Sequence, residues 1–320
     1  MTSYQRAGVD LEGAEAHVRR IADAVTATWG PNVVGSFGGF AAGITIPEGY
    51  RRPVLMLTTD GVGTKLELAR RAGRWEGVGR DLVAMCVDDL AAAGARPLAL
   101  VDYMAVGRLD GDRDRTIVES IAEGCEAAGC ALLGGETAEH PGVMDPGAVD
   151  LAAAALGVVE AGEELTPSSV RAGDLVVGLA SPNLRSNGFS LVREVLGDEV
   201  EDHFDLLLDP SVIYAPLVLE MAATGAVRSA AHVTGGGIPG NLPRALPEGL
   251  GAVVDTSTWE RPPVFDLLEE RGVTRDEMFR VFNMGIGFCL VVDADRVEDV
   301  TGLGGSVIGE IVLGSGVRLQ

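Results

Sequence analysis

The stretch that most constrains the fold is an apolar run, Val54–Thr59, that ends abruptly in the sequence DGVGTK at positions 60–65. Apolar runs of this length bounded by glycine predict a buried strand. Glycines leave room for backbone N–H groups to approach an anion. A carboxylate can bind a divalent cation, and an ammonium group can pair with a phosphate. The stretch therefore predicts a strand end that binds a phosphate-bearing ligand through Asp60 and Lys65.

Lys65 is the only lysine of the chain, which otherwise uses arginine for its permanent positive charges. The planar fork of arginine is a poor substitute where a compact point charge is needed. A salt-bridged lysine at a strand end is the ordinary alternative. The sequence favours the phosphate role.

The charge balance restricts the partners of this protein. Its 47 acidic and 25 basic residues give a formal net charge of −22. A chain this acidic is not expected to bind nucleic acid or an anionic membrane. An anionic substrate must therefore be bound by local positive or hydrogen-bond-donating groups. No run resembles a signal peptide or spans a bilayer. The cysteines form no CxxC pair, which indicates reduced, buried thiols and a cytoplasmic location; they are Cys86, Cys125, Cys130 and Cys289.

The chain alternates apolar strands, glycine-rich loops and amphipathic helices, which predicts an α/β architecture with its sites beyond the strand ends. Residues 160–173 are polar and contain proline and serines. This composition marks a boundary. We expect two domains, at residues 1–165 and 166–320.

Acidic residues occur within two apolar elements. A helix predicted at 78–93 carries Asp81, Asp88 and Asp89. Asp81 and Asp88 are seven residues apart and share a face, with Asp89 beside it. A carboxylate in such surroundings is costly unless it is paired or binds a metal. Asp102 lies within a strand predicted at 97–106, where a buried acid is a weak signal of a site.

Three further loops follow predicted strands. GGETAE at 134–139 follows Cys130–Leu133, SNG at 186–188 lies in the loop after Asp174–Ser181, and TGGG at 234–237 follows Ala230–Val233. Further helices are predicted at Ser211–Ala223 and Pro263–Glu270, and a further strand at Ile286–Val292. Ser186 or Asn187 can cap a helix predicted at 189–196. The spacing of glycines at 235, 237 and 240 matches a dinucleotide-binding fingerprint. The preceding strand is short and a proline lies within the motif, which argues against dinucleotide binding. Acids with a lysine favour magnesium-nucleotide binding, and hydroxyls with amides favour a second phosphate-bearing molecule.

At these motifs the chain resembles the phosphoribosylformylglycinamidine cyclo-ligase family. The resemblance extends over YQRAGVD, TDGVGTK, DLVAMCVDDLAAAGARP, GGETAE, GDLVVGL, SNGFSLVR, HVTGGGIPGN and FNMGIG. It implies a homodimer in which the N-terminal α/β domains, at 1–165, bind ATP and metal and join in a barrel. The C-terminal α/β domain, at 166–320, would bind the substrate. It also implies the reaction: ATP phosphorylates the formyl amide oxygen of formylglycinamidine ribonucleotide, the amidine nitrogen attacks that carbon, and phosphate leaves as the imidazole ring closes.

The resemblance implies roles for individual residues. Mg²⁺ would bind Asp60 and Asp89, and Lys65 would contact the ATP phosphates. Glu136 would orient the amidine, and His232 would transfer a proton, although a structural histidine is an equal alternative. The nucleotide residues would be Asp60, Gly61, Gly63, Thr64, Lys65, Asp88 and Asp102. The substrate residues would be Glu136, Thr137, Ser186, Asn187, Thr234, Gly235, Gly236 and Gly237.

The chain departs from the usual family pattern at several positions. Family members usually carry asparagine at position 88, histidine at 185, methionine at 140 and lysine at 5, where this chain has Asp88, Arg185, His140 and Gln5. Asp88 adds a negative charge and Arg185 a positive one, which fits a compensated change. Two alternatives stay open, a paralogue acting on a related ribonucleotide and a non-catalytic ATP-binding regulator.

Overall fold

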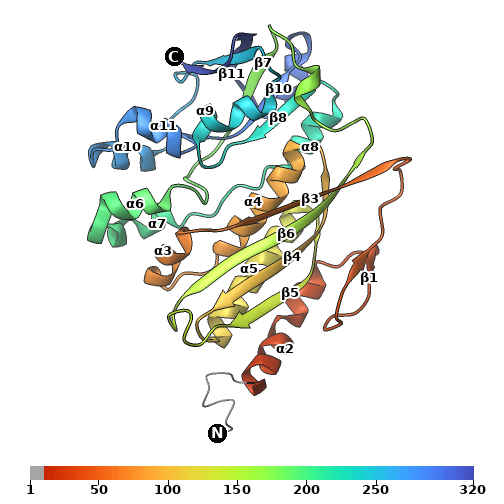
Figure 1. The fold of residues 1–320 in the computed structure, drawn as a ribbon, viewed down its shortest axis with the longest axis vertical. Helices are drawn as coiled ribbons and strands as arrows, with labels where there is room; N and C mark the ends of the chain where they lie inside the picture. Colours follow the sequence, from red (N-terminus) through yellow and green to blue (C-terminus); the bar gives the residue numbers. More distant parts are fainter. Residues whose placement is uncertain (1–10) are drawn as a thin grey trace.

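The computed structural model describes residues 11–320 and contains two large sheets on either side of a central helix, α4 (Figure 1). One sheet is built from residues 53–160 and the other from residues 175–319. The predicted α/β class is confirmed. The boundary predicted at 165/166 falls between the sheets and stays a prediction. The motif YQRAGVD, with Gln5, lies outside the described residues.

The first sheet has the strand order β3-β6-β4-β5. Its strands are β3 (Pro53–Gly61), β4 (Arg96–Val106), β5 (Ala131–Glu139) and β6 (Val149–Glu160). β6 pairs antiparallel with both β3 and β4, whereas β4 and β5 run parallel. Parallel strands require a crossover, which α5 (Gly111–Ala128) supplies.

Helices cover one face of this sheet. They are α2 (Leu11–Ala27), α4 (Val78–Ala92) and α5. α5 begins at Gly111 because the Asp110 carboxylate accepts the N–H groups of Asp112 and Arg113, satisfying donors that a helix start leaves free. α4 is apolar almost all round, and such helices are buried on all sides. It packs on the sheet and α5 on one side, and on β8 and α8 on the other.

Much of the opposite face of the first sheet is open among the described residues, although Ile44 and Tyr50 pack over Val158. Leu57 is 77% exposed there, and Leu55, Val101 and Tyr103 are also exposed. Side chains alternate between the faces of a strand, so the odd-numbered residues of β3 point outward and the even-numbered ones point to α4. The result is an apolar surface on strands β3 and β4.

The second sheet has the order β12-β9-β11-β7-β10-β8. Its strands are β7 (Leu175–Ala180), β8 (Val227–His232), β9 (Leu250–Val254), β10 (Ile286–Val292), β11 (Ser306–Leu313) and β12 (Gly316–Leu319). β10 is buried along its whole length, which explains why its sequence is a continuous apolar run. In register, Phe288 of β10 pairs with His232 of β8.

The remaining elements are short. The helices are α3 (Lys65–Ala72), α6 (Phe189–Leu196), α7 (Phe204–Leu207), α8 (Ala215–Ala223), α9 (Gly237–Asn241), α10 (Pro263–Glu270), α11 (Arg275–Val281) and α12 (Val297–Thr301). The 3-10 helices span Pro167–Ser169, Gly197–His203, Leu242–Ala245 and Ala294–Arg296, and β1 (Val33–Val34) pairs with β2 (Gly43–Ile44). Within residues 11–320 no helix combines the length and apolar character needed to cross a bilayer.

The expectations about local structure are wrong at β5 and at the start of α6. The sequence predicts that strand Cys130–Leu133 ends in a GGETAE loop, but β5 continues through Glu139 because it pairs with β4 up to Val106. The sequence also predicts a side-chain cap on α6. Gly188 is the N-cap residue, with φ +80° and no side-chain cap, and a Cβ there would lie 2.1 Å from the Phe282 ring.

Candidate active site

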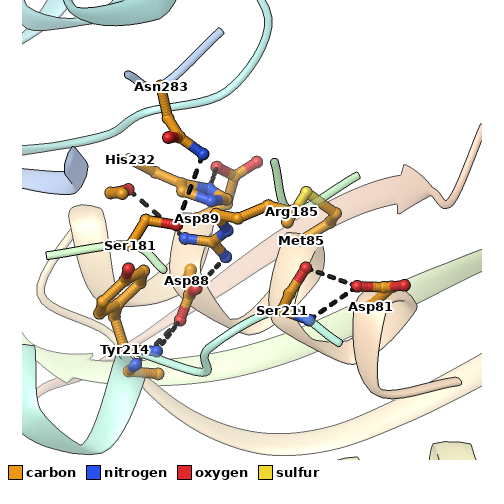
Figure 2. Close-up of polar contacts among 12 residues, drawn as sticks. Asp81, Met85, Asp88, Asp89, Ser181, Arg185, Ser211, Tyr214, His232 and Asn283 are labelled. Atoms are coloured by element: carbon orange, nitrogen blue, oxygen red, sulfur yellow. Dashed lines mark hydrogen bonds and ion pairs between the residues drawn. The ribbon is translucent and has the colours of Figure 1, made fainter. Parts of the chain in front are cut away.

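Helix α4 presents three polar or soft side chains to the C-terminal half of the protein. Asp81, Met85 and Asp88 follow a spacing of four and three residues and lie on one helix face, as Figure 2 shows. Asp81 and Asp88 are fully buried. Asp89 is the next residue along the helix, and its side chain is 40% exposed. The neighbouring acids therefore lie in different environments, and Asp89 is the one open to solvent.

Asp89 lies in a cleft of about 360 Å³ between the two sheets. The wall on the N-terminal side is formed by Met56–Thr58 of β3 and by the end of α4. The other wall is formed by Ser229–His232 of β8 and by the segment from Asn241 to Ala245. The cleft thus brings together residues far apart in the sequence.

His232 and Asp89 form a pair in this cleft (Figure 2). His232 Nδ1 lies 2.9 Å from Asp89 Oδ1. The imidazole stacks on Phe288, with ring centroids 5.9 Å apart and an interplanar angle of 16°. A carboxylate at Nδ1 favours the tautomer that has its proton there. Nε2 is then an acceptor, and it is buried without a hydrogen-bond partner in the described structure. Such an unpaired buried acceptor suits a site that meets a ligand.

Asp60 supplies a second carboxylate close to Asp89. Burial raises the pKa of the Asp60 carboxyl, and the negative charge of Asp89 raises it further. Asp60 Oδ1 accepts the backbone N–H of Gly61 at 2.7 Å, and Thr58 Oγ1 lies 3.5 Å from Asp89 Oδ2. A cation between these carboxylates would relieve their repulsion.

The donor set fits Mg²⁺ held jointly with a nucleotide. Among residues 11–320 no group of three or more His, Cys, Asp or Glu side chains converges as a metal site. Mg²⁺ commonly uses one or two protein carboxylates and takes its other ligands from substrate phosphates and water. Asp60 and Asp89 match that requirement.

Lys65, which the sequence expects at a phosphate, lies within the protein in an ion pair. Its side chain is 1% exposed, and Nζ lies 2.7 Å from Asp81 Oδ2. The ammonium also donates to the carbonyl of Asp209 at 2.9 Å. Asp81 Oδ1 in turn accepts the N–H and the hydroxyl of Ser211. Lys65 is therefore a buried ion-pair residue that connects α3 and α4 to the segment before α8.

Asp88, expected among the nucleotide residues, is also paired within the protein. One carboxylate oxygen accepts the N–H groups of Tyr214 and Ala215, and the other lies 2.6 Å from Arg185 Nη2. Neither side chain of the ion pair has exposed surface. The same contacts explain why α8 begins at Ala215 rather than at Ser211, where the sequence predicts its start. The N–H groups of residues 211, 214 and 215 bind α4 carboxylates instead.

The two loops expected to bind substrate phosphate lie together. A Cβ on Gly235 would be 3.5 Å from Asn187 Oδ1, which places residues 186–187 beside residues 234–237. Ser186 Oγ is buried without a partner. Gly236 and Gly237 have φ of +99° and +59°, a region that glycine adopts readily. A Cβ on Gly237 would lie 2.1 Å from the Phe279 carbonyl.

Asn241, the last residue of α9, contacts the loop of residues 234–237, and the sequence motifs do not assign it to the site. Its Nδ2 donates to the carbonyls of Thr234, Gly235 and Gly237, at 3.3, 3.2 and 2.9 Å. The side chain therefore holds the turn of residues 234–237 in place. An asparagine a few residues after a glycine run is the signal that could have indicated it.

Glu136, Thr137 and Asp102 do not line the cleft of Asp89 and His232. Glu136 is paired with Tyr103 in register and lies on the open face of the sheet. Thr137 Oγ1 lies 3.2 Å from Nε2 of the buried His17 on α2. Burial raises the pKa of Asp102 to about 7, with a smaller effect from Glu136.

A larger cavity of about 1130 Å³ lies beside α2, away from Asp89 and His232. Its lining includes Arg20, Arg108 and Glu139. Glu139 Oε1 accepts the N–H of Leu109 at 2.9 Å, whereas Oε2 is buried without a partner. The end of the GGETAE motif thus faces this cavity rather than the cleft.

Comparisons with known proteins agree with this architecture. The AIR synthase related protein N-terminal domain matches residues 41–159, and the C-terminal domain of the same description matches residues 171–320. Solved structures with the same fold include E. coli HypE, a hydrogenase maturation protein, with a TM-score of 0.69, 19% identity and coverage of 96% of this chain and 93% of that one. Thiamine-monophosphate kinase from Stenotrophomonas maltophilia has a TM-score of 0.68, 20% identity and coverage of 94% and 96%.

Relatives of higher identity share one name. The phosphoribosylformylglycinamidine cyclo-ligase of Synechococcus sp. (strain CC9311) is 46% identical, over 98% of this chain and 96% of the relative. The phosphoribosylformylglycinamidine cyclo-ligase of Myxococcus xanthus is 48% identical, over 92% of this chain and 90% of the relative. The two domain matches and the identity over nearly the whole chain indicate the same family. The chain belongs to the phosphoribosylformylglycinamidine cyclo-ligase family.

Proposed function

We propose that this protein is an ATP-dependent cyclo-ligase that converts formylglycinamidine ribonucleotide to aminoimidazole ribonucleotide, ADP and phosphate in purine biosynthesis. Family membership supports the reaction. The observation in the structure that carries the proposal is the Asp89–His232 pair, which lies in the cleft between the sheets and is near Asp60.

The carboxylates of Asp60 and Asp89 hold Mg·ATP at the end of β3. Mg²⁺ offsets negative charge on the transferred phosphoryl group when it is bound. Gly61 ends β3 and Gly63 lies in the turn after it, where the exposed Thr64 has its hydroxyl 3.1 Å from Ser190 Oγ. We assign this turn to the ATP phosphates. Lys65 and Asp88 support the cleft from within the protein and do not contact the nucleotide.

His232 handles a proton during ring closure. Transfer of the ATP γ-phosphoryl group to the formyl oxygen makes that oxygen a good leaving group. The amidine nitrogen then forms the C–N bond, phosphate departs with the oxygen, and the nitrogen loses a proton. Nε2 of His232 accepts this proton. Asp89 favours the tautomer that has its proton on Nδ1, which leaves Nε2 free to accept, and it stabilises the imidazolium that forms.

The substrate phosphate binds where residues 186–187 meet residues 234–237. Ser186 and Thr234 supply hydroxyls, Asn187 supplies an amide, and Gly235–Gly237 supply backbone N–H groups close to the anion. Local donors are needed because the protein is strongly acidic overall, with a formal charge of −22.

We further propose a cytoplasmic homodimer assembled through the open face of the first sheet. Leu55, Leu57, Val101 and Tyr103 are exposed there, and an apolar sheet face of this kind marks an association surface. Glu136 lies on the same face, so a second copy would bring it into an enclosed site. Asp102 and Thr137 lie on the strands that carry this face.

The test is an ADP-release assay with Mg·ATP and formylglycinamidine ribonucleotide, compared with other ribonucleotides. The proposal predicts one ADP and one aminoimidazole ribonucleotide per turnover with the named substrate. Release with a different ribonucleotide alone would instead establish a paralogue. Release with none, together with ATP binding, would establish a regulator.

A further inference from the structure

Arg185 is an unusual residue in the C-terminal half. It is a non-glycine residue at φ +59°, a conformation that costs energy for most side chains. It is also 1% exposed. Its guanidinium lies 2.6 Å from Asp88 Oδ2 and stacks 4.7 Å from the centre of the Tyr214 ring. A buried charge in a strained backbone persists only where its surroundings determine it strongly.

Asp88 neutralises this charge, and its second carboxylate oxygen accepts hydrogen bonds from the start of α8. Its Oδ1 accepts the N–H groups of Tyr214 and Ala215 at 2.8 and 2.9 Å. The carboxylate therefore lies at the N-terminus of α8, where the helix dipole stabilises a negative charge. Figure 2 shows Asp88 between the guanidinium and the start of α8.

Each partner of this ion pair is next to a group of the proposed site. Asp88 precedes Asp89, and Arg185 precedes Ser186 and Asn187. Arg185 Nη1 also approaches the carbonyl of Gly287 at 3.4 Å. The same carbonyl accepts the N–H of Val233, the residue after His232. The ion pair thus connects the helix of the metal carboxylate, the phosphate loop and the strand of the histidine.

We infer that the Asp88–Arg185 pair is a positioning device that fixes the substrate-phosphate loop relative to Asp89 and His232. Neither residue touches the substrate. This inference rests on the proposed function, because it takes Ser186 and Asn187 as phosphate donors. The pair acts as a unit, since removing one partner leaves an unpaired buried charge, whereas removing both charges is much better tolerated.

The experiment compares Arg185→Gln, Asp88→Asn and the double variant, with kcat and KM measured for the ribonucleotide and for ATP. Each single variant should lose about 10- to 100-fold in kcat/KM for the ribonucleotide, because small misplacements of a binding group are costly. The KM for ATP should change far less. The double variant should recover to within a few-fold of the wild type, which a non-additive pair predicts.

Arg185→Lys is the variant to use if Arg185→Gln does not fold. It keeps the buried charge and loses the planar fork, so it should fold and show an intermediate rise in KM. The control is Arg228→Gln, which breaks a different partly buried pair, with Asp174 at 3.0 Å. It should lower the melting temperature and leave both KM values unchanged.

Binding of ribose 5-phosphate, measured by calorimetry without turnover, separates this inference from the proposed reaction. Inactive wild type that still binds the probe, with weaker binding in Arg185→Gln, would refute the reaction and keep the positioning role. Two results would overturn the inference. One is an Arg185→Gln or Arg185→Lys enzyme whose KM and probe affinity match those of Arg228→Gln. The other is additivity of the two single effects in the double variant.

Discussion

At the scale of single residues, burial separates the side chains that support the site from those that are free to act in it. Lys65 and Asp81 are enclosed and paired with each other, whereas Asp89 keeps exposed surface beside its neighbour Asp88. The sequence identifies all four as unusual. It does not show that Asp81, sixteen positions after Lys65, takes up the ammonium charge, because that pairing exists only once α3 and α4 have packed.

Lys65→Met should destabilise the protein because it leaves the Asp81 carboxylate buried without its cation. Breaking one partner of a buried pair costs about 3–5 kcal/mol. The free energy of unfolding from urea titration measures this loss. Asp81→Asn in the Lys65→Met background should restore part of it. A Lys65→Met protein of unchanged stability whose turnover falls at least about 100-fold would contradict this assignment and indicate phosphate contact.

Asp102 gives a prediction about pH. Burial raises its pKa from the ordinary value of 3.8 to about 7. Between these values the native state keeps the proton that the unfolded state has lost, so stability falls as pH rises and is flat above about pH 7. Asp102→Asn should therefore stabilise the protein at pH 8, by at most about 4 kcal/mol, since a tenfold change in proton affinity corresponds to about 1.4 kcal/mol.

The measurement is the difference in unfolding free energy between wild type and Asp102→Asn across the pH range. The gain should shrink steadily as pH falls from 7 towards 4. Asp276→Asn, at an exposed position of α11, is the control. A constant difference at all pH values would contradict the account.

At the scale of elements, the sequence predicts what depends on local spacing. The apolar pattern locates α4, α6 and α10 within a residue at each end, and the run Ile286–Val292 is the observed β10. Long-range pairing decides the rest. β5 extends through two glycines because β4 offers it partners, and α8 starts late because α4 carboxylates bind the N–H groups before it.

The loop at 234–237 depends on a glycine at a specific position. Gly237→Ala should raise the KM for the ribonucleotide and destabilise the protein by about 1–3 kcal/mol, because a Cβ at positive φ is strained and would meet a carbonyl. That Cβ would lie 2.1 Å from the Phe279 oxygen.

Gly240→Ala is the matched control, in the same motif and also within α9. A Cβ there would meet nothing within 4 Å, so the KM should stay within about twofold, as expected for a surface change. Kinetics and thermal denaturation of both variants give the comparison. Equal KM values in the two variants would show that this loop does not bind the phosphate.

At the scale of the whole molecule, the open apolar face of the first sheet is the surface through which we propose that two copies associate. Leu57→Glu should convert the proposed dimer to a monomer, because it places a charge in the centre of an apolar interface. Leu57 is 77% exposed in the single chain. Light scattering after size exclusion measures the mass.

Leu313→Glu is the matched control, with 82% exposure on β11 of the other sheet. It should remain dimeric. A monomeric wild type, or a Leu57→Glu protein that is still a dimer, would contradict an assembly through the first sheet. The exposed face itself follows from strand alternation, but the sequence alone does not show which face the helices leave open.

We propose that Asp89, with Asp60 and His232, carries the chemistry at the cleft between the sheets. The most direct test is ADP release from Mg·ATP and formylglycinamidine ribonucleotide by Asp89→Asn beside the wild type. Loss of a charge that stabilises phosphoryl transfer predicts a fall of about 100-fold or more in kcat. The melting temperature should change little, because the Asp89 side chain is 40% exposed. An Asp89→Asn enzyme with near wild-type turnover would contradict the account.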